Sequence, residues 1–139
     1  MINKFNIRIY GIAKKQHHIL LCDELVHGNK VTKFVGGGLE FGEGTLDCLK
    51  REFLEETGKE VEVVRHIYTT DFFQPSVFNA EQQIISIYYE VRFAEEDFPF
   101  SNTPGFEHEL QFRWADINQI TEEDLTFPID RVVLGMIKN

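Results

Sequence analysis

The sequence has few cysteines, no long apolar run and no excess of positive charge. Cys22 and Cys48 stand 26 positions apart and form no CxxC pattern. Neither a disulfide framework nor a zinc site is therefore expected, and a reducing cytoplasm is the expected location. No stretch approaches the roughly 18 apolar residues of a transmembrane helix. Residues 1–15 also lack the apolar run and cleavage site of a signal peptide, so no membrane partner is expected.

The charge balance is acidic, with 23 Asp and Glu against 14 Lys and Arg and a net charge of −9. This balance disfavours unassisted binding to a nucleic-acid backbone or an anionic membrane. A small phosphorylated molecule stays open as a partner if metal ions bring it in. The chain has 42% hydrophobic and 27% charged residues, an ordinary globular composition. Its 139 residues predict a single domain spanning residues 1–139.

Hydrophobic spacing and turn residues predict an order of strands, helix, strands and helix. A glycine-rich turn is expected at residues 36–38. Together these predict an α/β domain in which helices pack on a mixed sheet. We expect strands at residues 4–13, 18–23, 31–35, 61–73, 83–93 and 110–114, helices at 45–57 and 129–137, and a loop at 94–105.

The first predicted helix carries acidic residues close to its apolar face. Thr45 is its expected N-cap, and Gly58 is the glycine expected to end it. The apolar side chains expected on one face are Leu46, Leu49 and Phe53, and a quarter-turn away stand Glu52, Glu55 and Glu56, with Cys48 on the acidic side.

Three carboxylates at positions i, i+3 and i+4 repel one another. Two unit charges about 6 Å apart at an effective dielectric of about 20 repel by roughly 3 kcal/mol. A divalent cation would turn this repulsion into attraction, and Mg²⁺ or Mn²⁺ prefers such oxygen ligands. Glycines before the helix would let backbone carbonyls or amides approach the ion and a phosphate, through positive φ angles that residues without Cβ adopt.

The spacing of these residues resembles the Nudix box, GX5EX7REUXEEXGU. Gly37 is followed after five residues by Glu43, and after seven more by residues 51–58, with the sequence Arg-Glu-Phe-Leu-Glu-Glu-Thr-Gly. Lys59 stands where an apolar residue is usual, and Val35 stands where a proline often precedes the glycines. Neither departure affects a carboxylate. Strands around the box and a Trp-containing strand at residues 113–116 are also similar to the family.

The resemblance implies an α/β/α sandwich with a mixed sheet between helices. It also implies Mg²⁺-dependent hydrolysis of a nucleoside diphosphate linked to another moiety: a nucleoside triphosphate, ADP-ribose or a nucleotide sugar. Glu52, Glu55 and Glu56 would bind metal with the carbonyl of Gly37 or a neighbour, and Glu52 could also act as base. Arg51 and Glu43 would form a supporting ion pair.

Residues outside the box are weaker candidates. A further base often lies in a loop elsewhere in this family, and Glu107 and Glu109 are the candidates; a solvated acidic loop is the alternative. Gly38 would join Gly37 beside the substrate. Phe73 could stack on a nucleobase, although packing is the alternative. A nucleotide-sensing module without catalysis also stays open, as do the number of metal ions and a homodimer.

Overall fold

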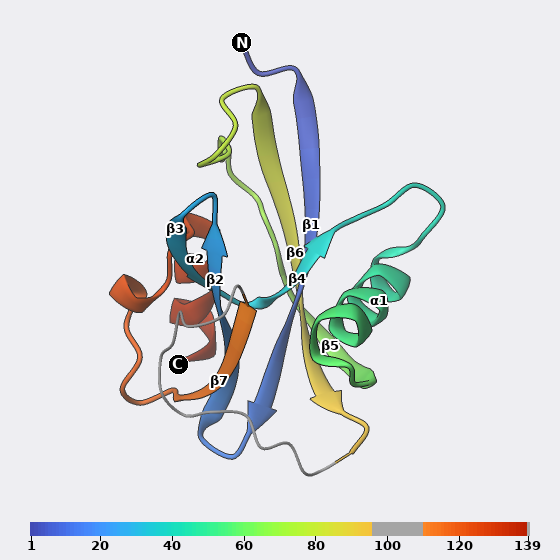
Figure 1. Cartoon of the computed structure of the whole chain (residues 1–139), viewed down its shortest axis with the longest axis vertical. Coiled ribbons are helices and arrows are strands. Elements are labelled where there is room, and N and C mark those ends of the chain that lie inside the picture. Colours follow the sequence, from blue (N-terminus) through green and yellow to red (C-terminus); the bar gives the residue numbers. More distant parts are fainter. Residues whose placement is uncertain (96–109, 139) are drawn as a thin grey trace. The chain divides into compact units, whose positions relative to one another are not determined.

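The computed structural model describes residues 1–95 and 110–138, and contacts divide the chain into two compact units. The first unit comprises Met1–Gly11 and Gly36–Ala94, and the second comprises Ile12–Val35 and Glu95–Asn139 (Figure 1). Strand β1 (Lys4–Lys15) begins in the first unit and ends in the second. The expected single domain stays a prediction.

The first unit is built from strands and one helix. Strand β1 lies between β6 and β4, and β5 pairs antiparallel with β6, with Val61 opposite Phe93 and Thr69 opposite Ile87. Besides β1, the elements are β4 (Val35–Gly38), α1 (Thr45–Thr57), β5 (Val61–Thr69) and β6 (Gln82–Phe93).

Helix α1 has the predicted bounds but a different N-cap. Gly44 caps the helix, and its amide donates a hydrogen bond to Asp47 Oδ2 at 3.0 Å. Thr45 is instead the first helical residue, and its hydroxyl lies 2.8 Å from the hydroxyl of Tyr89 on β6. Gly58 ends the helix as predicted, with a left-handed φ of 74°.

The buried face of α1 includes Cys48 and not Leu46, which differs from the prediction. Leu49 and Phe53 are fully buried, but Leu46 is 44% exposed, so its predicted place in the core is wrong. Gly11 on β1 allows the close packing, because a Cβ atom there would lie 2.5 Å from Phe53 Cε1. The absence of a side chain at Gly11 therefore determines how near α1 approaches the sheet.

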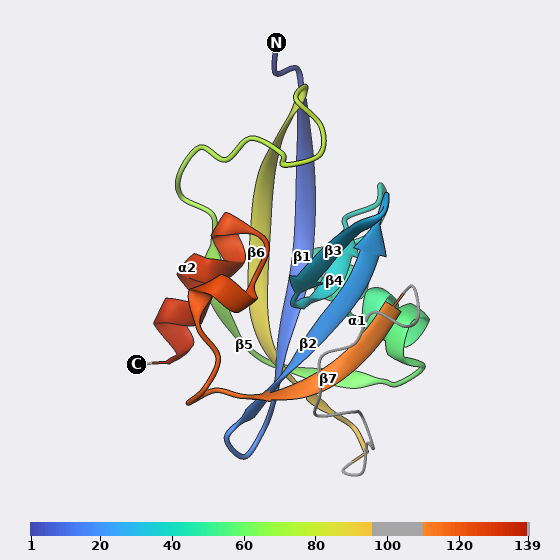
Figure 2. The same ribbon diagram turned by 60° about the vertical axis from the view of Figure 1, so that its left-hand side comes forward.

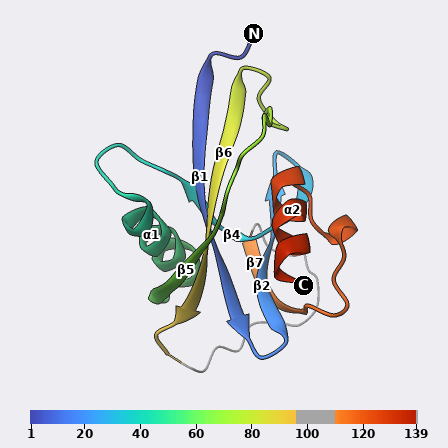
Figure 3. The ribbon, with the colours of Figure 1, turned by 180° about the vertical axis from the view of Figure 1, so that it is seen from behind.

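Two other predictions for the first unit need correction. Gly36, Gly37 and Gly38 belong to strand β4, not to a turn, and the turn follows at residues 39–44. Strand β5 ends at Thr69, so residues 70–73 belong to the connection to β6. In Figures 1 and 3 this connection lies on the opposite side of β1 and β6 from α1.

The second unit has its own strands and helix. Strand β2 pairs antiparallel with the end of β1, with β3 and with β7 (Figure 2). Asp23 is fully buried and accepts hydrogen bonds from Thr32 and Arg113 at 2.7 and 2.9 Å, so its charge is compensated. The elements are β2 (His18–Val26), β3 (Asn29–Lys33), β7 (Leu110–Asp116), the 3₁₀ turn η1 (Glu122–Asp124) and α2 (Pro128–Ile137).

Helix α2 begins at Pro128, one residue before the predicted start, and proline is favoured in a first turn because it has no backbone N–H to leave unpaired. Ile129, Val133 and Leu134 form its buried face. Within residues 1–95 and 110–138, neither helix is long and apolar enough to cross a membrane.

Candidate functional site

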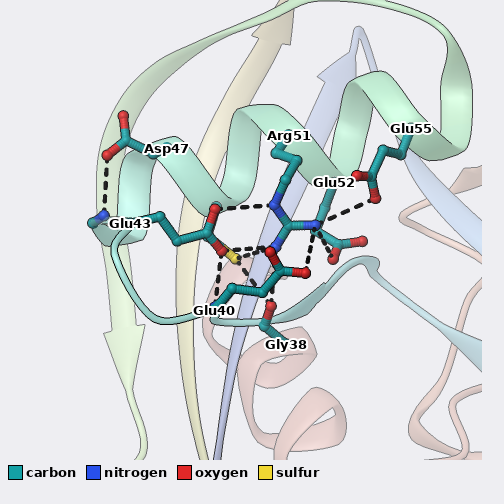
Figure 4. Close-up of polar contacts among 9 residues, drawn as sticks. Gly38, Glu40, Glu43, Asp47, Arg51, Glu52 and Glu55 are labelled. Atoms are coloured by element: carbon teal, nitrogen blue, oxygen red, sulfur yellow. Dashed lines mark hydrogen bonds and ion pairs between the residues drawn. The ribbon is translucent and has the colours of Figure 1, made fainter.

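Arg51 lies at the centre of a network that connects α1 to the preceding loop and to β4. Its Nε and Nη2 donate to the two carboxylate oxygens of Glu43 at 2.9 and 2.7 Å, a bidentate ion pair (Figure 4). Nη2 also donates to the carbonyl oxygen of Gly38 at 3.1 Å. The ion pair implied by the family resemblance is thus present, and it joins three segments of the first unit.

The charge of Glu43 is strongly stabilised. Its hydrogen bond from Arg51, followed by one from the backbone amide of Glu40, lowers the pKa of Glu43 to about 2. The hydrogen bonds of Arg51 with Glu43 and then with Glu52 raise the pKa of Arg51 above its ordinary value, so Arg51 and Glu43 both stay ionised across the physiological range. The ion pair of Glu43 with Arg51 therefore holds the loop at residues 39–44 against α1 throughout this pH range.

The third nitrogen of the same guanidinium brings carboxylates together. Arg51 Nη1 lies 2.9 Å from Glu52 Oε1, 3.3 Å from Glu55 Oε2 and 3.8 Å from Glu40 Oε1. The Glu52 side chain is only 13% exposed, whereas that of Glu55 is 60% exposed. The Glu52 carboxylate is therefore held by packing, whereas the Glu55 carboxylate is open to solvent.

Gly37 allows the carboxylate of Glu52 to lie directly against β4. A Cβ atom at position 37 would stand 2.4 Å from both Cδ and Oε1 of Glu52. Gly36 has a positive φ of 159°, but Gly37 and Gly38 do not, so the expectation of positive φ angles is wrong for these two glycines. They serve close approach, because any side chain at position 37 would displace the carboxylate.

Cys48 lies within this network and not beside an open space. Its thiol is fully buried, 3.5 Å from the Gly38 carbonyl oxygen and 3.7 Å from Arg51 Nη2. Burial, followed by the nearby Glu43 carboxylate, raises the pKa of Cys48 to about 12. The thiol therefore stays protonated and takes part in packing.

Arg8 is a nearby charged residue that the sequence analysis missed. It is half-buried on β1, and its Nε donates to the Tyr10 hydroxyl at 3.2 Å. Burial lowers its pKa, but Tyr10, Glu52 and Glu56 together raise it above the ordinary value. No sequence signal identified Arg8, because one arginine in an alternating strand resembles any solvent-facing residue.

The oxygen donors fit a hard divalent cation. No group of three or more His, Cys, Asp or Glu side chains in the described part of the chain is already arranged around a metal position. However, carboxylates of Glu52 and Glu55 converge on a single positive nitrogen, Arg51 Nη1. Carboxylate oxygens that meet at one positive charge are the donor set that Mg²⁺ and Mn²⁺ prefer.

Among the other predicted site residues, Phe73 is not brought to this network. Phe73 is 63% exposed and belongs to the β5–β6 connection, on the other side of β1 and β6 from α1 (Figure 3). Glu107 and Glu109 lie outside the described residues. Glu56 is half-buried on α1, and its electrostatic influence reaches Arg8.

Comparison with known proteins extends the similarity from the box to nearly the whole chain. A family model described as the NUDIX domain matches residues 4–134. The NAD-capped RNA hydrolase NudC of Vibrio vulnificus is 36% identical over 64 residues, which make up 46% of this chain and 24% of that protein. The match thus spans about a quarter of the length of this curated relative.

Solved structures share the fold at low sequence identity. A NUDIX hydrolase from Nitrosomonas europaea is 18% identical with a TM-score of 0.74, covering 95% of this chain and 87% of that chain. A MutT NUDIX hydrolase from Burkholderia pseudomallei is 14% identical with a TM-score of 0.74, covering 97% and 99%. These similarities confirm the predicted α/β/α fold with a mixed sheet and two helices.

Proposed function

Since the chain belongs to the NUDIX family of hydrolases, we propose that it hydrolyses a pyrophosphate bond in a nucleoside diphosphate linked to another moiety. The observation that carries this proposal is the convergence of Glu52 and Glu55 on one positive charge, Arg51 Nη1. A pyrophosphate substrate needs a divalent cation between its own negative oxygens and such carboxylates. The acidic network supplies the protein side of that arrangement.

The residues of α1 have separate proposed roles. Glu52, Glu55 and Glu56 would hold Mg²⁺ or Mn²⁺ with a backbone carbonyl of Gly37 or its neighbour. When bound, the cation would neutralise the pyrophosphate and acidify the attacking water. Glu52 is the proposed base toward that water, since its carboxylate is held against Gly37 in one orientation.

Arg51 would change partners when the cation binds. Its Nη1 now neutralises Glu52 and Glu55, whereas Nε and Nη2 bind Glu43 and Gly38. We propose that the contacts of Arg51 with Glu43 persist, whereas Nη1 loses its contacts with Glu52 and Glu55 as these carboxylates bind the cation. Glu43 therefore supports the site by keeping the guanidinium in place, without touching the substrate.

A second base outside the box remains a proposal. Glu107 and Glu109 are its candidates, and each can be tested separately as a Gln variant. A fall of about 10²-fold in kcat for one variant would identify the base, as expected for loss of general-base catalysis. Equal kcat in both variants and the wild type would leave the base on α1.

A panel of nucleotides is needed to identify the substrate, because the network on α1 would contact only the reacting pyrophosphate. The proposed candidates are nucleoside triphosphates, ADP-ribose and nucleotide sugars. One matching relative is named an NAD-capped RNA hydrolase, so NAD and a short NAD-capped RNA belong on the panel. Phe73 is proposed to contact a nucleobase. A change in substrate preference across this panel in Phe73 variants would support that contact.

The proposal is tested by measuring hydrolysis of each compound in this panel with Mg²⁺ or Mn²⁺, in the presence and absence of a chelator. We expect release of phosphate or nucleoside monophosphate that chelator abolishes. Tight nucleotide binding without turnover on any member would instead support the alternative, a nucleotide-sensing module. For location we propose a reducing cytoplasm, since Cys22 and Cys48 are both buried and not joined in a disulfide.

A further inference from the structure

Arg8 has a guanidinium that is held in place, and within the described residues 1–95 and 110–138 no carboxylate forms an ion pair with it. Its Nε donates to the Tyr10 hydroxyl at 3.2 Å, and its Cζ lies 5.8 Å from the centre of the Tyr10 ring. Tyr10 is itself buried and stacks on Tyr88 with ring centres 5.3 Å apart. The position of Arg8 is therefore fixed by a rigid aromatic support.

The two terminal nitrogens of Arg8 differ from those of Arg51. Within residues 1–95 and 110–138 they have no hydrogen-bond partner and no carboxylate within ion-pair distance, whereas every nitrogen of Arg51 has one. Nη1 of Arg8 lies 3.5 Å from where a Cβ atom of Gly38 would stand. The glycine therefore leaves space beside a fork of donors, which matches the oxygens of a phosphate.

Arg8 is also close to the proposed catalytic carboxylates. Side chains alternate along β1, so Arg8 and Tyr10 lie on one face, and Gly11 lies on the other, against α1. Even so, the charges of Glu52 and Glu56 are felt at the Arg8 guanidinium. A Cβ atom at Gly37 would meet the Glu52 carboxylate, and a Cβ atom at Gly38 would lie 3.5 Å from Arg8 Nη1, so the two groups lie against consecutive residues of β4.

We propose that Arg8 binds a phosphate group of the substrate, next to the phosphate held through Glu52 and Glu56. This inference rests on the proposed function. A positive group besides a metal ion would favour the approach of a nucleotide with at least two negative phosphates to a protein of net charge −9. Arg8 supplies a fixed bidentate donor for this purpose.

The test measures binding as well as turnover. Inorganic pyrophosphate and ATP are titrated calorimetrically into wild type, Arg8→Gln, Arg8→Lys and the control Arg92→Gln, each with Mg²⁺ and again with chelator. Arg92 is a matched control because it lies on β6 of the same unit and forms an exposed ion pair with Glu62. Circular dichroism and melting curves establish that each variant is folded.

We expect Arg8→Gln to weaken pyrophosphate binding by about tenfold or more, with and without Mg²⁺, and to raise KM more than it lowers kcat. Arg8→Lys should recover part of the affinity, since it keeps the charge but loses the fork. Arg92→Gln should bind as the wild type does.

Two results would overturn the inference: equal pyrophosphate affinity in wild type and Arg8→Gln, or no binding by the wild type. In the first case Arg8 would only compensate the charge of Glu52 and Glu56. Failure of the proposed function gives a different result from failure of this inference. Absence of hydrolysis across the whole panel, with binding that still depends on Arg8, would reject hydrolysis and support the phosphate site.

Discussion

Gly37 on β4 and Glu52 on α1 are so close that no side chain fits between them. A Cβ atom on Gly37 would lie 2.4 Å from the carboxyl carbon of Glu52. The glycine of the box and the glutamate fifteen positions later thus form one contact between a strand and a helix. Through this contact β4 determines the orientation of the carboxylate on which the proposed chemistry depends.

Replacement of Gly37 by alanine should impair activity more than stability. The added methyl group meets the far end of a flexible side chain, so Glu52 can move at little cost to the fold. Its displacement should lower kcat by roughly ten- to hundredfold, because catalysis is sensitive to misplacement of about 1 Å. Gly135→Ala in α2 is the control, since a Cβ atom there meets nothing within 4 Å. Wild-type kcat in Gly37→Ala would contradict this role.

Replacement of Gly36 by alanine should have the opposite pattern. A Cβ atom at Gly36 would lie 2.0 Å from the backbone oxygen of Ile9, which cannot move without disturbing the pairing of β4 with β1. We expect a loss of roughly 1–3 kcal/mol in the free energy of unfolding, typical of overpacking. Urea denaturation measures it, with Gly37→Ala as the comparison. Equal stability of the two variants would show that β4 adapts freely.

Much of the site was predictable from α1 alone. The 3.6-residue period places Glu52, Glu55 and Glu56 together, and the family resemblance implies the contact of Glu43 with Arg51. Both relations depend on local geometry or on one short loop.

Other features depend on contacts between distant segments. The Gly36–Gly38 strand was missed because glycine is a weak strand former and its place follows from pairing with β1. The exposure of Leu46 could not be predicted either, because the position at which the sheet meets the helix, and not the helical period, decides which side of α1 is buried. The approach of Arg8 to Gly38 needs the same pairing of β1 with β4.

Glu43→Gln should change the dependence of stability on pH. The pKa of Glu43 is about 2 in the folded chain, below its ordinary value of 4.5. Its contribution is therefore present above about pH 4.5 and is lost as the pH falls toward 2. Melting temperatures of wild type and variant should differ most at neutral pH and converge in acid. A difference that stays constant down to pH 2 would contradict the assigned ion pair.

Arg51→Lys should lower both stability and kcat. Lysine keeps the charge but cannot bind both oxygens of Glu43 and the Gly38 carbonyl as the planar guanidinium does. The control is Lys50→Arg, the reverse exchange at the exposed neighbouring position of α1. Thermal melting and steady-state kinetics are the measurements. Wild-type behaviour of Arg51→Lys would show that charge alone suffices.

The most direct test of pyrophosphate hydrolysis at α1 compares wild type with Glu52→Gln on the nucleotide panel in Mg²⁺. The variant keeps the size of the side chain but removes the charge that the proposed site requires. The expected result is metal-dependent hydrolysis by the wild type and a fall in kcat of about 10²-fold or more in the variant. Equal turnover by the two proteins would contradict the proposed role of Glu52 and, with it, the assignment of the active site.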